Sequence, residues 1–235
     1  MIFMRAVTIF PMGDGPAVRF AARALQKQGV DVAPALSEQV THVLLNVPTK
    51  EADLSSVPAG VTVIGGNLEH IPDCYPKVDL LHEEQYLAEN AALTADCALR
   101  LLGQHLPVAL RDCPILIIGW GRIGKCLASI LKALGAQVSV AARKPSDLGM
   151  LTALGYKAVE IGNIDPIPYR AILNTAPAPV LSPGGNAVKI DLASRLGMPG
   201  EEVIWARGLP GKMLPESSGE LIARGVLRYL GEGEE

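Results

Sequence analysis

Three glycines at fixed spacing are the strongest chemical signal in the sequence. An aliphatic run at 115–118 leads directly into Gly119-Trp120-Gly121-Arg122-Ile123-Gly124, which has the spacing Gly-x-Gly-x-x-Gly. In such a turn the first glycine permits the sharp bend, the second lets a pyrophosphate approach the backbone, and the third lets the next helix pack closely. The N–H groups at the start of that helix attract the phosphates. The motif therefore predicts a dinucleotide-binding turn in which all six residues contact the cofactor.

The glycine spacing alone is a weak signal, because a tight strand-to-helix turn without a ligand uses the same residues. The flanking sequence reduces this ambiguity. An amphipathic run at 125–134 is followed by Gly135-Ala136 and by a second apolar strand at Val138–Ala142. The order of strand, glycine turn, helix and parallel strand favours nucleotide binding over the alternative of an unliganded turn.

The residues after the second strand indicate which nucleotide is bound. In NAD sites, Asp or Glu usually stands roughly 20 residues after the glycines and holds the ribose diol. Here Arg143 lies 19 positions after Gly124 (143 − 124), Lys144 follows it, and Ser146 adds a hydroxyl. A guanidinium attracts a 2′-phosphate, which a carboxylate would repel. We predict NADP as cofactor and NAD as second choice. The alternative is that Arg143 and Lys144 are solvated loop charges.

Polar loops follow the later predicted strands, Ala171–Leu173, Ala187–Leu192 and Val203–Trp205. Ligands bind outside the carboxyl ends of the strands in open α/β sheets. We expect two short segments to contact the cofactor at its nicotinamide half: Asn174, Thr175 and Ala176, and Asp191 with Leu192. Asp191 fits equally well as a buried carboxylate that caps a loop.

The next residues are candidates for contact with a substrate. Ser194 and Arg195 follow the strand that ends at Leu192, and the guanidinium fork of Arg195 matches the two oxygens of a carboxylate. The segment Gly208-Leu209-Pro210-Gly211 is predicted to be a tight turn that presents backbone N–H groups. We therefore place a carboxylate-binding site at these loops.

The residues before the glycine motif predict a smaller layer of alternating strands and helices. Apolar strands are expected at 6–10, 30–32, 42–47 and 61–64, with a helix at 18–28. Asp14 follows the first strand, where it faces a cleft or, as the simpler interpretation, caps the helix. A long helix is expected from Glu83 to Leu102. Glu89 near its start is a candidate for a catalytic cleft, although a solvated helix face explains it as well.

Together these patterns predict the α/β class: a Rossmann doubly wound parallel sheet and a smaller N-terminal α/β domain that is flavodoxin-like. We expect the small domain at 1–82, a connecting helix at 83–105, and the dinucleotide-binding domain at 106–215. A C-terminal helix at 216–235 is expected to pack back on the N-terminal domain.

Composition excludes several classes of protein. Of the 235 residues 49% are hydrophobic and 19% charged, which is typical of a folded globular chain. A net charge of −3 without a basic block argues against nucleic acid as a partner. No apolar run is long enough to span a bilayer, and residues 1–5 lack the layout of a signal peptide. We expect a cytoplasmic protein with reduced cysteines.

The histidines and cysteines add two further expectations. Cys74, Cys97, Cys113 and Cys126 form no ligand spacing with the four histidines, so we expect no metal site. All four histidines lie at or before residue 105. An oxidation of a 2-hydroxy acid needs a general base, commonly His, after the glycine motif. A hydride transfer that needs no such base fits this sequence better.

The combined motifs resemble those of the A-subunit of bacterial dipicolinate synthase. The resemblance runs from the connecting helix to near the end of the chain, in what looks like a shortened member of the family. It rests most on Asp191-Leu192-Ala193-Ser194-Arg195 and on Gly208-Leu209-Pro210-Gly211, together with the glycine turn, Ala141-Ala142-Arg143 and Leu173-Asn174-Thr175. Gly13-Asp14 and Glu89 also match the family pattern.

The resemblance implies a fold like that of D-2-hydroxyacid dehydrogenases. It also implies an NADP-linked oxidation of a dihydrodipicolinate-level intermediate to dipicolinate in sporulation, with a small dicarboxylate as substrate and a flavoprotein-like B-subunit as partner. We further expect a homo-oligomer. Two other functions remain open: an NADP-dependent dehydrogenase of another small carboxylic acid, and a non-catalytic nucleotide-binding regulatory subunit.

Overall fold

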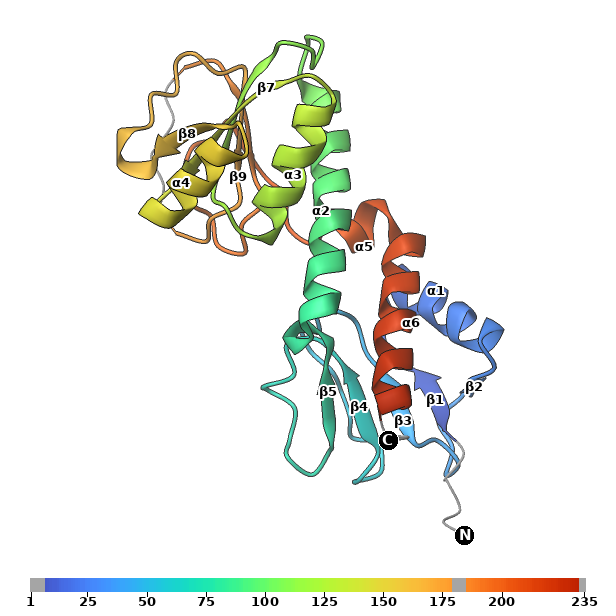
Figure 1. Cartoon of the computed structure of the whole chain (residues 1–235). Coiled ribbons are helices and arrows are strands. Elements are labelled where there is room, and N and C mark those ends of the chain that lie inside the picture. The colour runs from blue at the N-terminus through green and yellow to red at the C-terminus, as the bar shows by residue number, and fades with distance from the viewer. Residues whose placement is uncertain (1–6, 179–184, 233–235) are drawn as a thin grey trace. The chain divides into compact units, whose positions relative to one another are not determined.

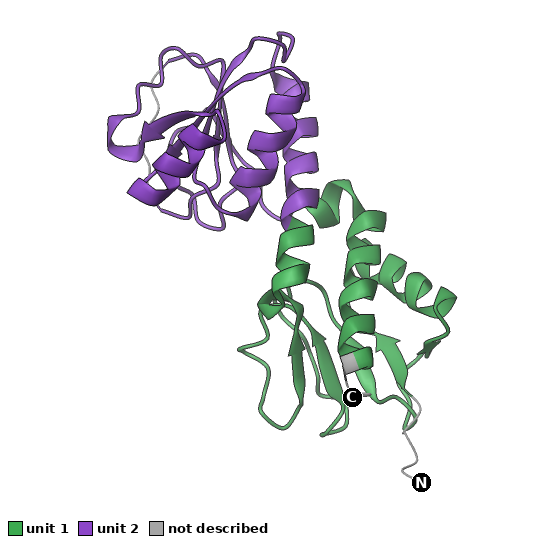
Figure 2. Ribbon diagram, in the orientation of Figure 1, with its two compact units in different colours: residues 1–90, 210–235 green, residues 91–209 purple. Residues whose placement is uncertain are grey.

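The computed structural model describes residues 7–178 and 185–232 and divides into two compact units (Figures 1 and 2). Unit 1 comprises residues 1–90 and 210–235, and unit 2 comprises residues 91–209. Helix α2, Glu84–His105, begins in unit 1 and continues into unit 2. The domain boundaries predicted at 82, 105 and 215 stay predictions. Within the described part of the chain, no helix has the length and apolar character that a membrane crossing requires.

Unit 1 is built on a five-stranded parallel sheet. Its strand order, β2-β1-β3-β4-β5, is that of flavodoxin-like folds. The strands are β1 (Thr8–Pro11), β2 (Asp31–Val32), β3 (His42–Leu44), β4 (Thr62–Gly65) and β5 (Lys77–Asp79). Ala6, which we assigned to the first strand, lies outside the described residues. The predicted parallel α/β layer is therefore confirmed.

Both faces of this sheet carry buried apolar side chains. On one face, Val43, Leu45 and Val63 are buried in an apolar cluster whose other members come from the loops around the sheet, not from helices. Side chains alternate along a strand, so Leu44 and Ile64 point to the opposite face, where both are fully buried. Helices α1 (Pro16–Lys27) and α6 (Pro215–Glu232) belong to this unit.

Unit 2 is a six-stranded parallel sheet with the Rossmann strand order. The order β11-β10-β9-β6-β7-β8 reverses between β6 and β9, and ligands of such sheets bind at this reversal. The strands are β6 (Pro114–Ile118), β7 (Gln137–Ala142), β8 (Lys157–Glu160), β9 (Ala171–Asn174), β10 (Val188–Asp191) and β11 (Val203–Trp205). The predicted Rossmann fold is confirmed.

Helices α3 (Arg122–Ala133) and α4 (Pro145–Ala153) connect the first three strands of this sheet. The connection from β8 to β9 contains only a short 3-10 helix, Ile161–Asn163. Its residues Ile161, Ile164 and Tyr169 pack against the sheet, around the buried side chains of Leu116 and Ile172. Irregular segments therefore seal apolar surface that a longer helix would cover in a larger Rossmann domain.

Three elements differ from the sequence predictions. Strands β5 and β8 were not predicted, because each has only one or two apolar residues between charged ends and so lacks a strand pattern. The prediction of a tight turn at 208–211 was wrong. Gly208 takes a positive φ of 60°, and the chain then enters the short helix α5, Leu209–Met213. Pro210 is tolerated there because the first helical turn needs no N–H from it.

Helices α1 and α6 pack closely against each other at Gly219. A Cβ atom at this position would lie 2.5 Å from the carbonyl oxygen of Ala17 and 2.8 Å from the backbone nitrogen of Ala21. These are backbone atoms of α1, which cannot move aside as a side chain would. The absence of a side chain at Gly219 therefore sets the separation of the two helices.

We predict that Gly219→Ala destabilises the protein by about 1–3 kcal/mol, because the added methyl forces the helices apart. The matched control is Gly231→Ala on the same helix, where a Cβ would meet no atom within 4 Å. This control should be neutral or stabilising by up to about 1 kcal/mol, since Ala is the better helix former. Urea denaturation of both variants measures the effect. Equal stability of Gly219→Ala and the wild type would contradict the close-packing argument.

Candidate dinucleotide-binding site

The glycine turn lies at the carboxyl end of β6, beside the end of β9. Gly119 has a φ of 104°, and a Cβ there would lie 2.6 Å from the Thr175 Oγ1 atom. A Cβ at Gly124 would lie 2.2 Å from the carbonyl oxygen of Gly119. A Cβ at Gly121, by contrast, would meet no protein atom within 4 Å. The first and third glycines are thus required by the fold, whereas the open space at the second is left for a ligand.

Helix α3 begins at this turn without a capping side chain. Gly121 is its N-cap residue, and no side chain accepts a hydrogen bond there. The first turn of the helix contains no acidic residue. Backbone N–H groups at a helix start need acceptors, and a phosphate supplies them together with a charge that suits the helix dipole. The geometry fits a pyrophosphate at this place.

The aromatic residue of the motif packs within unit 2. The half-buried Trp120 ring meets the ring of Tyr156 edge-on, with 5.7 Å between centroids. The Lys125 ammonium lies 5.8 Å from the centroid of the Trp120 ring. Ile123 is also half-buried, in the first turn of α3. These contacts connect Trp120, and with it the glycine turn, to α3 and to the residue directly before β8.

Thr175 and Ala176, at the end of β9, are brought against the glycine turn. The Thr175 hydroxyl donates to the carbonyl oxygens of Ile118, at 3.0 Å, and Gly119, at 3.4 Å. Its backbone N–H also donates to Ile118, at 2.8 Å. We predicted that Thr175 faces the nicotinamide. In the structure its hydroxyl braces the turn that would hold the phosphates, a contact that the sequence could not reveal.

Asp191 is fully buried and accepts four hydrogen bonds. Its Oδ1 atom accepts from the Asn174 amide at 3.0 Å and from the backbone N–H of Ala193 at 2.9 Å. Its Oδ2 atom accepts from the backbone N–H groups of Gly197, at 2.8 Å, and Met198, at 2.9 Å. No acceptor site remains that faces solvent. Of the two roles considered for Asp191, the geometry supports the structural one.

Asn174 is equally enclosed. Its side-chain amide donates to Asp191 and to the Ala176 carbonyl, at 3.1 Å, while its Oδ1 atom accepts from the Ala176 N–H at 3.0 Å. Its exposed fraction is 0%, and Leu192 is also buried. We predicted that these side chains touch the cofactor. Because the Asn174 and Asp191 side chains are buried and bonded within the protein, we now assign them to positioning the loops.

Arg195 and Ser194 lie on the loop that Asp191 holds. Both residues are exposed, whereas Ala193 before them and Gly197 after them are buried. Among the described residues, neither side chain forms a hydrogen bond or ion pair. The loop is therefore anchored from within, and its polar side chains stay available outside the carboxyl end of β10.

The three residues predicted to select the nucleotide also lie together. Arg143, Lys144 and Ser146 are exposed at the carboxyl end of β7, where α4 begins with Lys144 as its N-cap. No side chain caps this helix, and the first acidic residue is the half-buried Asp147 in its first turn. This arrangement leaves two cationic side chains and an uncapped helix start at the position where a ribose phosphate is expected.

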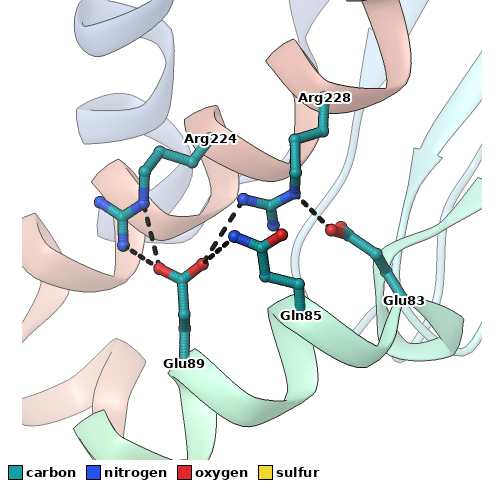
Figure 3. A network of polar contacts seen from close by, with 5 residues as sticks. All are labelled: Glu83, Gln85, Glu89, Arg224 and Arg228. Carbon is teal, nitrogen blue, oxygen red and sulfur yellow. Dashed lines mark hydrogen bonds and ion pairs between the residues drawn. The ribbon is translucent and has the colours of Figure 1, made fainter. Parts of the chain in front are cut away.

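Glu89 has a different environment from the one that we predicted. Figure 3 shows its carboxylate facing Arg224 and Arg228 of α6. Arg224 donates to Glu89 from Nη2 at 2.5 Å and from Nε at 3.1 Å, and Gln85 donates at 3.3 Å. Arg228 bonds Glu83 and reaches Glu89 at 3.5 Å. The contacts join the start of α2 to α6 within unit 1, so the geometry supports a structural role for Glu89.

These contacts also affect the ionisation of Glu89. Burial opposes the charged form, but the hydrogen bonds and charge of Arg224, with Gln85 and Arg228, outweigh it and hold the pKa of Glu89 below its ordinary value. A lowered pKa stabilises the fold above the ordinary pKa of Glu, and the contribution is lost as the pH falls through the lowered value. The contribution to the free energy of unfolding is modest, because the Glu89 and Arg224 side chains are partly exposed.

Asp14 is held by a residue that the sequence did not single out. Asn46, two positions after β3, donates from Nδ2 to the Asp14 carboxylate at 2.7 Å. Its Oδ1 atom accepts from the backbone N–H of Gly15 at 3.0 Å. Asp14 does not cap α1, whose N-cap is Gly15 without a side-chain bond. Asn46 has no motif of its own, so only the pairing of β1 with β3 brings it here.

One group of potential metal ligands is present among the described residues: Glu69, Asp79 and His82, whose ligand atoms lie within 4.8 Å of one another. Both carboxylate oxygens of Asp79 already accept backbone N–H groups, from Leu68 and Leu81. Glu69 and His82 are exposed. The expectation that the chain holds no metal stays a prediction.

We predict that Asp191→Asn destabilises the protein by about 3 kcal/mol, because an amide group must then face N–H donors in a buried site. The control is Asp112→Asn, an exposed change of the same charge, which should stay within about 0.5 kcal/mol of the wild type. Urea denaturation measures both. Tryptic cleavage after Arg195 should also accelerate in Asp191→Asn alone. A wild-type cleavage rate would contradict the anchoring role.

With this geometry in place, the chain can be compared with known proteins. No family model matches the sequence. The A-subunit of dipicolinate synthase from Bacillus subtilis (strain 168) is 27% identical over an alignment of 213 positions, and the match covers 79% of this chain and 70% of that protein. The similarity therefore extends over most of both chains.

Solved structures agree with this relationship. The crystal structure of the dipicolinate synthase A chain from Bacillus subtilis superposes with a TM-score of 0.81 at 20% identity, covering 98% of each chain. D-lactate dehydrogenase from Escherichia coli superposes with a TM-score of 0.56 at 12% identity, covering 96% of this chain and 97% of that chain. The second match bears out the expected likeness to dehydrogenases in fold. The chain is thus similar to the A-subunit of dipicolinate synthase, in sequence over most of its length and in fold over almost all of it.

Proposed function

We propose that this protein is an NADP-dependent oxidoreductase of the same type as the A-subunit of dipicolinate synthase. Its reaction would be hydride transfer from a dihydrodipicolinate-level intermediate, which yields dipicolinate. The sequence similarity to that A-subunit supports this choice of reaction. The dehydrogenase-like fold of the second structural match supports a nicotinamide cofactor.

The open face of Gly121 is the observation that carries the proposal. Gly119 and Gly124 are closed by neighbouring backbone and side-chain atoms, but Gly121 borders open space at the start of an uncapped helix. A turn that served packing alone would have no need of a glycine there, since the backbone of Gly121 is extended and any residue adopts it (φ −80°, ψ −169°). Close approach of a pyrophosphate explains this glycine.

The choice of NADP rests on the end of β7. Arg143 and Lys144 are both exposed there, and no carboxylate precedes Asp147 on that loop. Arg143 would bind the 2′-phosphate through charge-assisted hydrogen bonds, and Ser146 would add a hydroxyl near the start of α4. NAD is the second choice, because it lacks the 2′-phosphate with which these residues would form contacts.

The proposed chemistry needs little help from acids or bases. Bound NADP would accept the hydride. The dihydropyridine ring would lose that hydride from a ring carbon and a proton to water, and would become aromatic. Residues of this chain would bind and orient the substrate: Arg195 through one of its carboxylates, with Ser194 beside it. The position of all four histidines at or before residue 105 agrees with a reaction that uses no late histidine as base.

A flavoprotein-like B-subunit would act with this chain, as the resemblance implies, and the chain would also form a homo-oligomer. We place the protein in the cytoplasm and the reaction in sporulation. Mixing the purified chain with its candidate B-subunit and separating the complex by size tests the first point.

We predict that dipicolinate forms when the protein, NADP and freshly made dihydrodipicolinate synthase product are mixed, with or without the candidate B-subunit. Ultraviolet absorbance of dipicolinate and of reduced cofactor would rise together. The control is Gly121→Val, whose Cβ would enter open space and whose apolar side chain at the N-cap of α3 should cost no more than about 1 kcal/mol of stability. It should nevertheless lose cofactor binding and turnover.

The outcomes separate the candidate functions. Cofactor reduction with another small carboxylic acid, and none with this substrate, would favour a different dehydrogenase. NADP binding without turnover of any of these acids, with or without the B-subunit, would favour a regulatory nucleotide-binding protein. Wild-type NADP binding by Gly121→Val would defeat the assignment of the cofactor site itself.

We predict that Arg143→Ala weakens NADP binding by about tenfold to a hundredfold, the worth of a charge-assisted phosphate contact. NAD binding should change by less than about twofold, because NAD has no 2′-phosphate. Isothermal titration calorimetry of both cofactors against both proteins measures the difference. Tighter binding of NAD than of NADP by the wild type, unchanged in the variant, would rule out this selectivity.

A further inference from the structure

Two arginines emerge at the carboxyl ends of neighbouring strands in unit 2. Arg195 lies four positions after β10, and Arg207 lies two positions after β11. The two strands pair in parallel, with Asp191 opposite Trp205. The Ala206 N–H donates to the Asp191 carbonyl at 2.8 Å, which extends this pairing beyond the strand. Arg207 is therefore carried to the same edge of the sheet as the loop at 193–195.

Trp205 ties Arg207 to that loop. Its indole N–H donates to the carbonyl oxygen of Ala193 at 3.2 Å. The Arg207 guanidinium carbon lies 5.2 Å from the centroid of the Trp205 ring, within the range of a cation–π contact. The residue Trp205 nonetheless remains 46% exposed. Trp205 thus acts as a platform that connects Ala193, two residues before Arg195, to the guanidinium of Arg207.

Arg195 and Arg207 carry positive charges that no described carboxylate neutralises. Within residues 7–178 and 185–232, no carboxylate forms an ion pair with Arg195 or Arg207. The arginines of α6 behave differently, since Arg224 and Arg228 are both paired with glutamates. Two exposed guanidinium groups without acidic partners, on adjacent strand ends, suit an anionic ligand with two acidic groups.

We propose that Arg207, held over Trp205, is a second carboxylate anchor, which makes the site selective for dicarboxylates over monocarboxylates. Arg195 would bind one carboxylate, and Arg207 would bind the other. The two strand ends lie on the side of the reversal where the nicotinamide half of a dinucleotide is expected. This inference rests on the proposed function and names the residue that sets its substrate class.

The test compares the binding of two ligands that differ by one carboxylate, pyridine-2,6-dicarboxylate and pyridine-2-carboxylate, to the protein saturated with NADPH. Calorimetry should show tighter binding of the dicarboxylate by the wild type. Arg207→Met should weaken the dicarboxylate by about tenfold or more and the monocarboxylate by less than about twofold. Arg195→Met should weaken both ligands.

Three further variants sharpen the result. Arg170→Met removes an exposed charge just before β9, at the amino end of the same sheet, and should change neither affinity. Trp205→Phe keeps a ring but loses the indole N–H, and should reduce selectivity less than Arg207→Met does. Arg207→Lys keeps the charge without the fork and should fall between Arg207→Met and the wild type.

The outcomes distinguish this inference from the function on which it rests. Dicarboxylate affinity in Arg207→Met equal to that of the wild type would overturn the role of Arg207 and leave the proposed function standing. Equal losses for both ligands would overturn selectivity as the role of Arg207. A wild-type protein that binds neither ligand would overturn the inference together with the proposed function.

Discussion

The buried carboxylate of Asp191 is the interaction on which the candidate site depends. It joins the ends of β9 and β10 through Asn174 and holds the loop at 193–198 through three backbone N–H groups. A buried charge is tolerated only when hydrogen bonds replace its hydration, and here both oxygens are fully used. The consequence is a rigid inner layer from which Ser194 and Arg195 face outward. The candidate site and the stability of unit 2 therefore both depend on one side chain that is fully bonded within the protein.

The glycine turn is held in place by close packing, as the loop at 193–198 is held by hydrogen bonds. Gly124 packs against the Gly119 carbonyl, and Thr175 bonds the same turn from β9, so the bend has little freedom to move. A pyrophosphate site gains from such rigidity because the N–H groups need no reorganisation when the ligand arrives. Only Gly121 is left open. In this turn the fold therefore requires glycine at positions 119 and 124, whereas a bound ligand would require it at position 121.

Polar residues that looked alike in the sequence have contrasting roles in space. Glu89 and Asp191 were both candidates for ligand contact, yet each forms its bonds within the protein, with arginines in one case and with backbone N–H groups in the other. Arg143, Arg195 and Arg207 form no ion pair among the described residues. Because buried charges need partners and exposed ones do not, the exposed cations are the better candidates for recognising an anionic ligand.

The class of the fold, the glycine turn and the order of the major elements could all be predicted from the sequence, since they depend on local patterns of apolar residues and glycines. The sequence also indicated the resemblance to the A-subunit of dipicolinate synthase. It did not reveal β5, β8, the short helix at 209–213 or the bracing role of Thr175. The partner of each polar side chain depends on contacts between residues that are far apart in the sequence, so it became known from the three-dimensional structure. Asn174 with Asp191, Glu89 with Arg224, and Trp205 with Arg207 are brought together by strand pairing, helix packing and loop geometry rather than by a sequence motif.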